Sequence, residues 1–336
     1  MTAATATTAP PRTSPAVAAA RRNAWTLGLL GFLVLLLAFT KAINPDYGVA
    51  GLQGLAIAVL PLALATVGQA IVVISGGIDL SVSAMMALVA VIAASQMEGL
   101  SPEGGLVVVA AVLVFGLFLG AVNGSVIVVT RVPDIVVTLA MSFVWAGFAL
   151  LVLNTPGGKA VTWLRELVLG PISVGPVTVD FLPKAIVVLA LVVAVIWIPL
   201  RRSRLGLSIY AIGSNRLAAF RSGVAVGRTK IAAYALTGLF AALAGLSVVA
   251  STSIGDPKPG PYTLPAVAAV VLGGVSLAGG RGGIIGPLIA VVILQLIRTD
   301  MTFLNLDTNL AVVVQGLILI GVVMIGSFTQ LRRNRA

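Results

Sequence analysis

Apolar residues occur along this chain in long, nearly unbroken blocks, and polar residues gather in short segments between them. A helix needs about 20 predominantly apolar residues to cross the hydrocarbon core of a bilayer. Blocks near that length therefore predict transmembrane helices, and we expect an all-α polytopic membrane protein with about ten spans. The blocks cover roughly residues 25–40, 49–75, 80–95, 106–130, 135–153, 185–200, 231–251, 265–278, 284–297 and 310–328.

Composition agrees with a membrane protein and argues against an enzyme. The chain is 59% hydrophobic and 9% charged, whereas a soluble domain carries about 25% charged residues. It contains neither Cys nor His, which excludes thiol nucleophiles, thiolate metal sites and imidazole acid–base chemistry. Paired carboxylates and an activated nucleophile are also missing from the pattern, so we predict no catalytic residue and no metal site.

The net charge of +11 follows membrane topology rather than nucleic-acid binding, because the basic residues lie in the short segments between apolar blocks. With the N-terminus inside, 15 of the 21 Lys and Arg residues fall in cytoplasmic segments. The positive-inside rule favours that orientation. We therefore expect both ends in the cytoplasm, a disordered N-terminus over 1–24, one transmembrane domain over 25–330 and a basic tail over 331–336.

Several apolar blocks are shorter than a full crossing or are interrupted. Block 80–95 has 16 residues, block 265–278 has 14 and contains Gly273-Gly274, and block 49–75 contains Pro61. Short or Gly/Pro-interrupted segments are typical of broken helices that line a transport pathway. Glycine also permits close packing of helices, and the pattern leaves both interpretations open.

Two glycine-rich stretches resemble each other. Residues 76–81 read GGIDLS and residues 273–278 read GGVSLA, 197 positions later, and each ends a span that runs from outside to inside. This echo suggests two bundles in the same orientation, although chance similarity also fits. Asp79 either lines the inner end of a pathway or caps the next helix. We favour the cap, since Asp79 and Ser81 both suit a helix start.

The longest cytoplasmic segment, 201–230, contains seven basic residues and no acidic one. Within it, Asn215 suits a helix N-cap, Leu217 and Phe220 share a face, and Gly223 suits the helix end. A short helix that presents Leu and Phe to the cytosol either docks onto a partner or rests on lipid headgroups.

Three ordered motifs resemble one family. GGIDLS at 76–81 resembles the signature of permease subunits of ribose/xylose/arabinose-type bacterial ABC importers. Residues 204–224 resemble the family's "RxGxxIYAxGxNxxAAxxSGV" coupling segment, and residues 268–282 resemble its "AAVVLGGTSLxGGxG" stretch. With compatible spacing over most of residues 50–330, these matches identify the chain as a member of that family.

The resemblance implies a multi-pass protein of the bacterial inner membrane, in which two permease copies pair. Separate ATP-binding subunits, which hold the ATP and Mg²⁺, dock on the cytoplasmic loops, and an extracytoplasmic binding protein delivers a sugar or related neutral solute. This chain has no phosphate-binding loop and needs no cofactor. The implied coupling residues are Gly213, Asn215, Arg216, Leu217, Ala219, Phe220, Ser222 and Gly223, and the implied pathway or gate residues are Gly76, Gly77, Asp79, Ser81, Gly273, Gly274 and Ser276.

The chain departs from the family pattern at three places. Tyr262-Thr263-Leu264-Pro265 stands where a Tyr-Glu-Leu-Asp run is common, Arg216 stands where Glu is usual, and Ser83 replaces a Gly. The acidic residues of the family's Tyr-Glu-Leu-Asp run, which this chain lacks, lie near the outer mouth, and their absence puts the exact substrate in doubt.

Neutral amides inside the spans suit a neutral polyhydroxylated solute. For any single amide we favour a hydrogen bond between helices, worth about 0.6 kcal/mol. These amides are Gln53, Gln69, Asn123, Gln295 and Gln315. A permease for branched-chain amino acids or nucleosides is the near alternative. An ion-coupled secondary transporter is a third possibility, disfavoured because the spans contain almost no ionisable residues.

Overall fold

The computed structural model describes residues 24–306, except 175, 176 and 259, together with six single positions between 310 and 324. The predicted N-terminal tail and basic tail lie outside the described residues, as do Gln315 and most of the block 310–328.

The described chain is predominantly helical, as predicted. Seven of its helices are long and apolar enough to cross a membrane: α2 (Ala24–Ile43), α3 (Val49–Ile74), α5 (Pro102–Thr130), α6 (Asp134–Val152), α8 (Lys184–Arg202), α11 (Val226–Thr252) and α13 (Ile285–Phe303). Two apolar helices are shorter, α4 (Val82–Met97) and α12 (Thr263–Leu272). These two correspond to the blocks that the sequence marks as too short for a full crossing.

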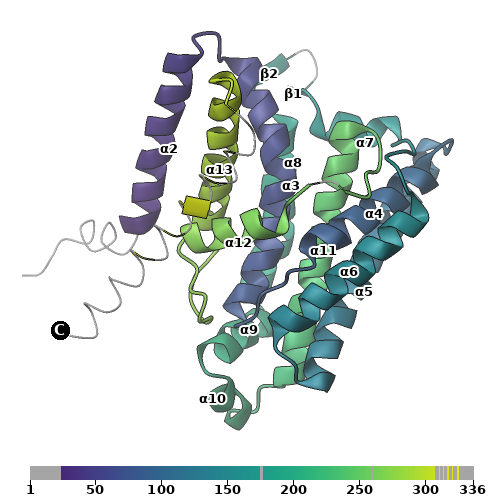
Figure 1. The fold of residues 1–336 in the computed structure, drawn as a ribbon, viewed down its shortest axis with the longest axis vertical. Helices are drawn as coiled ribbons and strands as arrows, with labels where there is room; N and C mark the ends of the chain where they lie inside the picture. The colour runs from purple at the N-terminus through teal and green to yellow at the C-terminus, as the bar shows by residue number, and fades with distance from the viewer. Residues whose placement is uncertain are drawn as a thin grey trace, which may run out of the picture.

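The two ends of the molecule differ in structure (Figure 1). One end carries the short helices α9 (Arg204–Ser214) and α10 (Arg216–Arg221). The other end carries α7 (Thr162–Val168) and an antiparallel hairpin of β1 (Pro171–Val174) and β2 (Val177–Pro183). The seven basic residues of segment 201–230 lie in and beside α9 and α10, at the first of these two ends.

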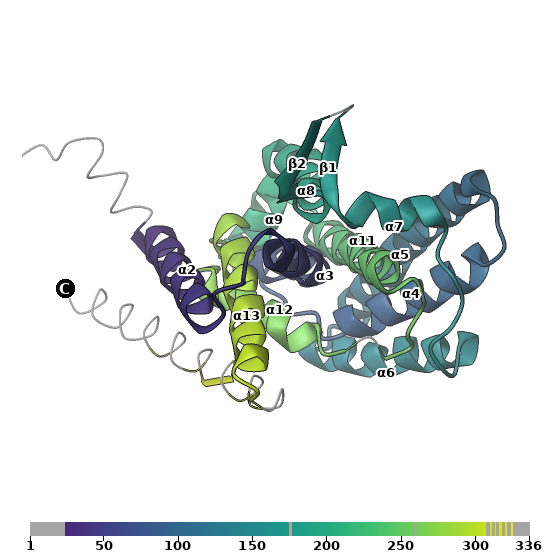
Figure 2. The ribbon, with the colours of Figure 1, turned by 90° about the horizontal axis from the view of Figure 1, so that it is seen from above.

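The centre of the bundle is formed by α3 and α11; Figure 2 shows α3 end-on with α11 beside it. In the most hydrophobic stretch of α3, 89% of the residues are buried, and the corresponding share for α11 is 67%. For the peripheral helices α2 and α8 the share is 11%. An apolar helix that is buried on all sides belongs to a core, whereas an exposed apolar helix requires lipid or another protein.

Close packing of α5 against α11 depends on glycines at four-residue spacing. Gly116, Gly120 and Gly124 lie on one face of α5. A Cβ atom at Gly120 would collide with the backbone carbonyl of Tyr234 on α11, and one at Gly238 would collide with the carbonyl of Gly116. Small residues at this spacing allow helix backbones to approach closely in a membrane.

Candidate functional site

The three sequence motifs converge at the C-terminal end of α3. The backbone N–H of Gly280 donates a 2.8 Å hydrogen bond to the carbonyl of Ile74. Gly213, at the end of α9, lies against both residues, and a Cβ atom there would overlap the Ile74 carbonyl. The coupling segment therefore contacts the loops that contain GGIDLS and GGVSLA directly, with no side chain between the backbones.

Glycine is required in this junction by conformation as well as by space. Gly76, Gly279 and Gly280 have φ angles of 81°, 84° and 69°. Residues with a Cβ atom rarely adopt positive φ. An added Cβ at Gly279 would also lie 2.9 Å from both the Gly213 carbonyl oxygen and the Cα of Gly76.

The coupling segment folds into two capped helices. The Ser203 hydroxyl accepts from the backbone N–H of Gly206 at the start of α9 (3.1 Å). The side-chain oxygen of Asn215 accepts from the N–H of Ala218 at the start of α10 (2.9 Å). Gly223 has φ 82° just beyond α10. The predicted N-cap and the predicted helix end are both confirmed.

Helix α10 presents an exposed apolar surface, which we call the α10 knob: the side chains of Leu217 and Phe220. Leu217 is 59% exposed and Phe220 is 67% exposed, whereas Ala219 is buried against Ile212 and Val226. Arg216, Arg221 and Ser222 are also exposed around the knob. One face of α10 is thus anchored to the chain, and its opposite face is available.

A buried ion pair lies next to this junction. Lys230, in the second turn of α11, is 2.7 Å from Asp134 at the start of α6, and their side chains are 10% and 13% exposed. The Tyr234 hydroxyl donates to the other carboxylate oxygen of Asp134 (2.7 Å). Both the Tyr234 hydroxyl and that oxygen pack closely on Gly77. The pair therefore holds α6 and α11 against the GGIDLS loop.

The structure corrects the predicted role of Asp79. Helix α4 begins after Ser81, so Asp79 lies before the cap position, and the Ser81 side chain makes no capping bond. Asp79 Oδ1 instead accepts from the backbone N–H of Ser81 (2.8 Å) and from its hydroxyl (2.6 Å). The prediction of an N-cap is wrong because the carboxylate is used within the turn that precedes the helix.

Two of the predicted pathway amides take part in this buried network. Asn123 donates to the Ser81 hydroxyl (2.7 Å) and accepts from the Trp145 indole N–H (3.1 Å). Gln69 donates to the Asp79 carbonyl (3.0 Å) and accepts from its N–H (3.2 Å), in the amide orientation that satisfies both groups. Gln69, Asp79 and Asn123 have no exposed surface. Their contacts connect α3, α5 and α6 to the start of α4.

The remaining glycine and amide candidates are spread over the bundle. Gly273 and Gly274 line an inner cleft of about 510 Å³ together with Trp25. The backbone N–H of Ser276 donates to the Arg281 carbonyl (3.1 Å). Gln295 donates to the Ala58 carbonyl (2.9 Å). Gln53 is partly buried near the outer end of α3. These residues do not form one cluster with Gln69 and Asn123.

The first turns of the two short helices meet in a seam that sequence analysis did not predict. The Ser83 N–H donates to the Thr263 hydroxyl (3.0 Å), and the Ser83 hydroxyl accepts from the Tyr262 N–H (3.1 Å). The Ser83 hydroxyl also donates to the Gly260 carbonyl (2.9 Å). Ser83 and Thr263 are both positions where the chain departs from the family pattern, and that coincidence was the available sequence signal.

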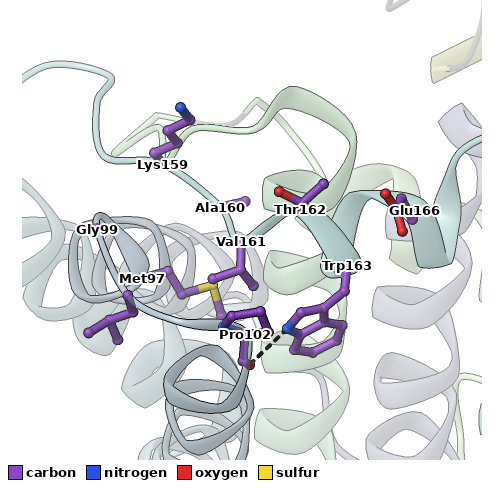
Figure 3. Close-up of a pocket in the computed structure, with 10 residues that line it drawn as sticks. Met97, Gly99, Pro102, Lys159, Ala160, Val161, Thr162, Trp163 and Glu166 are labelled. Carbon is purple, nitrogen blue, oxygen red and sulfur yellow. Dashed lines mark hydrogen bonds between the residues drawn. The ribbon is translucent and has the colours of Figure 1, made fainter.

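A separate cleft of about 440 Å³ lies between the end of α4, the start of α5 and α7. Figure 3 shows the Trp163 indole directed at Pro102, whose carbonyl accepts from the indole N–H at 3.0 Å. Lys159 and Glu166 also line this cleft. The residues that line this cleft include none of the seam residues and none of the α10 knob residues.

Comparison with known proteins agrees with this arrangement. Residues 51–323 match the model of a family described as "Branched-chain amino acid transport system / permease component". The chain belongs to this permease family. Seven helices of the described part of the chain are long and apolar enough to cross a membrane, and the permease is a multi-pass protein of the bacterial inner membrane.

Relatives of the permease are named as import permeases. It is similar to a ribose import permease protein of Escherichia coli K12, with 36% identity over 271 residues, which cover 80% of this chain and 83% of the relative. It is 31% identical to the ribose import permease protein of Haemophilus influenzae, over 88% of this chain and 91% of that one. An autoinducer 2 import system permease protein of Escherichia coli is 28% identical, over 94% and 95%. No solved structure matches the permease significantly.

Proposed function

We propose that this chain is the membrane-spanning subunit of an ATP-driven importer for a monosaccharide or related neutral solute, and that a separate ATPase subunit grips the α10 knob. The exposed Leu217 and Phe220 side chains carry the proposal. An apolar pair held out from a capped helix in the cytosol loses its contact with water only against a partner. Two relatives named for ribose import support the solute class.

The knob is mechanically connected to the proposed pathway. Gly213 joins α9 to the loops after α3 and α12 by backbone contact. From α10 the chain continues through residues 222–225 into α11, whose Lys230 contacts Asp134. A movement of α10 driven by ATP in the partner subunit therefore has two short routes into the bundle, one through the glycine junction and one through α11.

The topology proposed for the whole chain has ten membrane segments, with both ends in the cytoplasm and two bundles of the same orientation. The α9–α10 end, which is rich in basic residues, supports the placement of that side in the cytoplasm. Exposed apolar residues on α5 and α6, such as Phe118 (58%) and Phe143 (72%), suit contact with lipid and with a second permease copy. An extracytoplasmic binding protein would then meet the hairpin end.

The docking proposal is tested by Phe220→Asp in the complete importer. The charge is expected to prevent co-purification of the ATPase subunit and to abolish solute-stimulated ATP hydrolysis, because a carboxylate is costly to bury in an apolar groove. The matched control is Phe181→Asp, which replaces a Phe of similar exposure (72% against 67%) at the opposite end of the molecule. Normal assembly and hydrolysis in Phe220→Asp would refute the docking assignment.

A second measurement separates this mechanism from ion-coupled transport. Uptake in intact cells is expected to stop when ATP is depleted and to continue when a protonophore collapses the proton gradient while ATP is maintained. The reverse pattern would support a secondary transporter.

A further inference from the structure

A second cleft, of about 330 Å³, lies in the outer half of the bundle and is not explained by coupling to an ATPase. Its walls are the first half of α3, the end of α11, the loop that follows α11, and α13. We call it the outer cleft. The residues that line it are Gly54, Ile57, Ala58, Pro61, Val248, Ser251, Thr252, Ile254, Asp256, Tyr262 and Gln295.

The polar atoms that the outer cleft offers are mostly hydrogen-bond acceptors. Gln295 uses its NH₂ group on the Ala58 carbonyl, which leaves its side-chain oxygen available. Asp256 accepts a backbone N–H from Lys258 with Oδ1 only (2.7 Å). Pro61 has no N–H to donate to the carbonyl of Ile57, four residues earlier on α3. Two side-chain acceptor groups, from Asp256 in the loop and Gln295 on α13, therefore line the same space, beside an α3 wall in which the Ile57 carbonyl lacks its helical donor.

Tyr262 adds an aromatic wall and a hydroxyl. Its ring lines the outer cleft, and its hydroxyl has no hydrogen-bond partner within the described part of the chain. Apolar side chains of Ile57, Val248 and Ile254 complete the lining. Several acceptors beside an aromatic and aliphatic surface match a neutral molecule that carries many hydroxyl groups on a carbon ring. A solute without any N–H or O–H group would leave the Asp256 carboxylate without a donor.

The same residue connects the outer cleft to the seam. The Tyr262 N–H donates to the Ser83 hydroxyl, and the next residue, Thr263, accepts from the Ser83 N–H. The outer cleft thus ends where the first turns of α4 and α12 are held together.

We propose that the outer cleft is an entry site for a neutral polyhydroxylated solute, held by hydrogen bonds to Asp256, Gln295 and Tyr262. The proposal rests on the proposed importer function and names the place where that importer first takes up its cargo. The seam between Ser83 and Tyr262 forms the closed floor of this site.

Because the chain has no native cysteine, single cysteines report directly on access to the outer cleft. Ser251→Cys places a thiol in the cleft, and Ser247→Cys, one turn deeper on α11, places it at a buried position (6% exposed). In right-side-out membrane vesicles that contain the complete importer, a membrane-impermeant cationic methanethiosulfonate is expected to label Ser251→Cys and to spare Ser247→Cys. A thiol at position 251 that stays unlabelled would overturn the proposal.

Solute protection tests the chemical class. D-ribose, D-xylose and D-galactose are the probes, and L-leucine is the comparator. At least one sugar is expected to slow labelling of Ser251→Cys about tenfold at a concentration about ten times its Kd, because only unoccupied sites react. L-leucine is expected to have no effect. Equal protection by L-leucine, or protection by none of the sugars, would refute a site for polyhydroxylated solutes.

Asp256→Asn removes the charge and keeps the shape of the side chain. Uptake of the protecting sugar is expected to fall about tenfold, because hydrogen bonds to charged groups are the stronger ones. The ATPase subunit should still co-purify with this variant. Undiminished uptake would contradict the role of Asp256, whereas failure of the unmodified permease to co-purify with an ATPase would instead contradict the proposed function.

Discussion

The buried pair of Lys230 and Asp134 gives a quantitative prediction. Each single variant, Lys230→Met or Asp134→Leu, leaves the other charge buried at about one-tenth exposure without its partner. Breaking a buried pair in this way costs about 3–5 kcal/mol of folding free energy. Replacing both partners by apolar residues of similar size is often close to neutral, so the double variant should regain most of the loss.

The hydrogen bond of Tyr234 determines how much folding free energy the double variant still loses. Its hydroxyl loses the 2.7 Å bond to Asp134 and keeps only the Ile78 carbonyl at 3.4 Å. One weakened buried hydrogen bond accounts for about 1–2 kcal/mol. The double variant should therefore cost far less than the two single variants added together.

The assay is thermal unfolding of the purified permease in detergent. An unfolding entropy of about 2.1 cal/mol/K per residue over about 280 residues gives about 0.6 kcal/mol/K, so a single variant should lower Tm by about 5–9 °C. Lys159→Met, which removes an exposed cation outside, is the control and should stay within about 1 °C. A double variant as unstable as both single variants combined would show that the two charges act independently.

Three further predictions concern backbone packing and capping. Gly213→Ala should uncouple ATP hydrolysis from uptake, because its methyl group overlaps the Ile74 carbonyl. It should also lower Tm, since overpacking costs about 1–3 kcal/mol. Unchanged coupling would contradict the role of the glycine junction. Gly120→Leu should prevent accumulation of folded permease, measured by size-exclusion chromatography, since α5 cannot move away from the Tyr234 carbonyl on α11 without opening the core. Normal yield would refute the close approach of α5 and α11. Asn215→Ala should weaken binding of the ATPase subunit modestly, because about 1 kcal/mol of capping energy is lost. Asn215→Asp, which keeps a capping oxygen, should bind normally. Equal binding by both variants would show that the cap is not needed.

Local features were predictable from the sequence because they depend on neighbours along the chain. The helical class follows from block length, and two of the short blocks, 80–95 and 265–278, became the short helices α4 and α12. The cap at Asn215, the helix end at Gly223 and the exposure of Phe220 follow from spacing within a few residues. Each of these outcomes requires only local hydrogen bonds and periodicity.

Residues far apart in the sequence were brought together only by the tertiary structure. The pairing of Asp134 with Lys230 spans 96 positions, and the Ser83–Thr263 contact spans 180. Whether Asp79 caps a helix depended on where α4 begins, and Ser81 was a competing donor for its carboxylate. Likewise, only the assembled bundle shows that Gln69 and Asn123 are buried and bonded while Gln295 borders a cleft. The length of an apolar block determines which segments enter the membrane, because lipid excludes unpaired backbone groups and charges. It leaves open which polar side chains meet inside, because that choice depends on how the helices pack against one another.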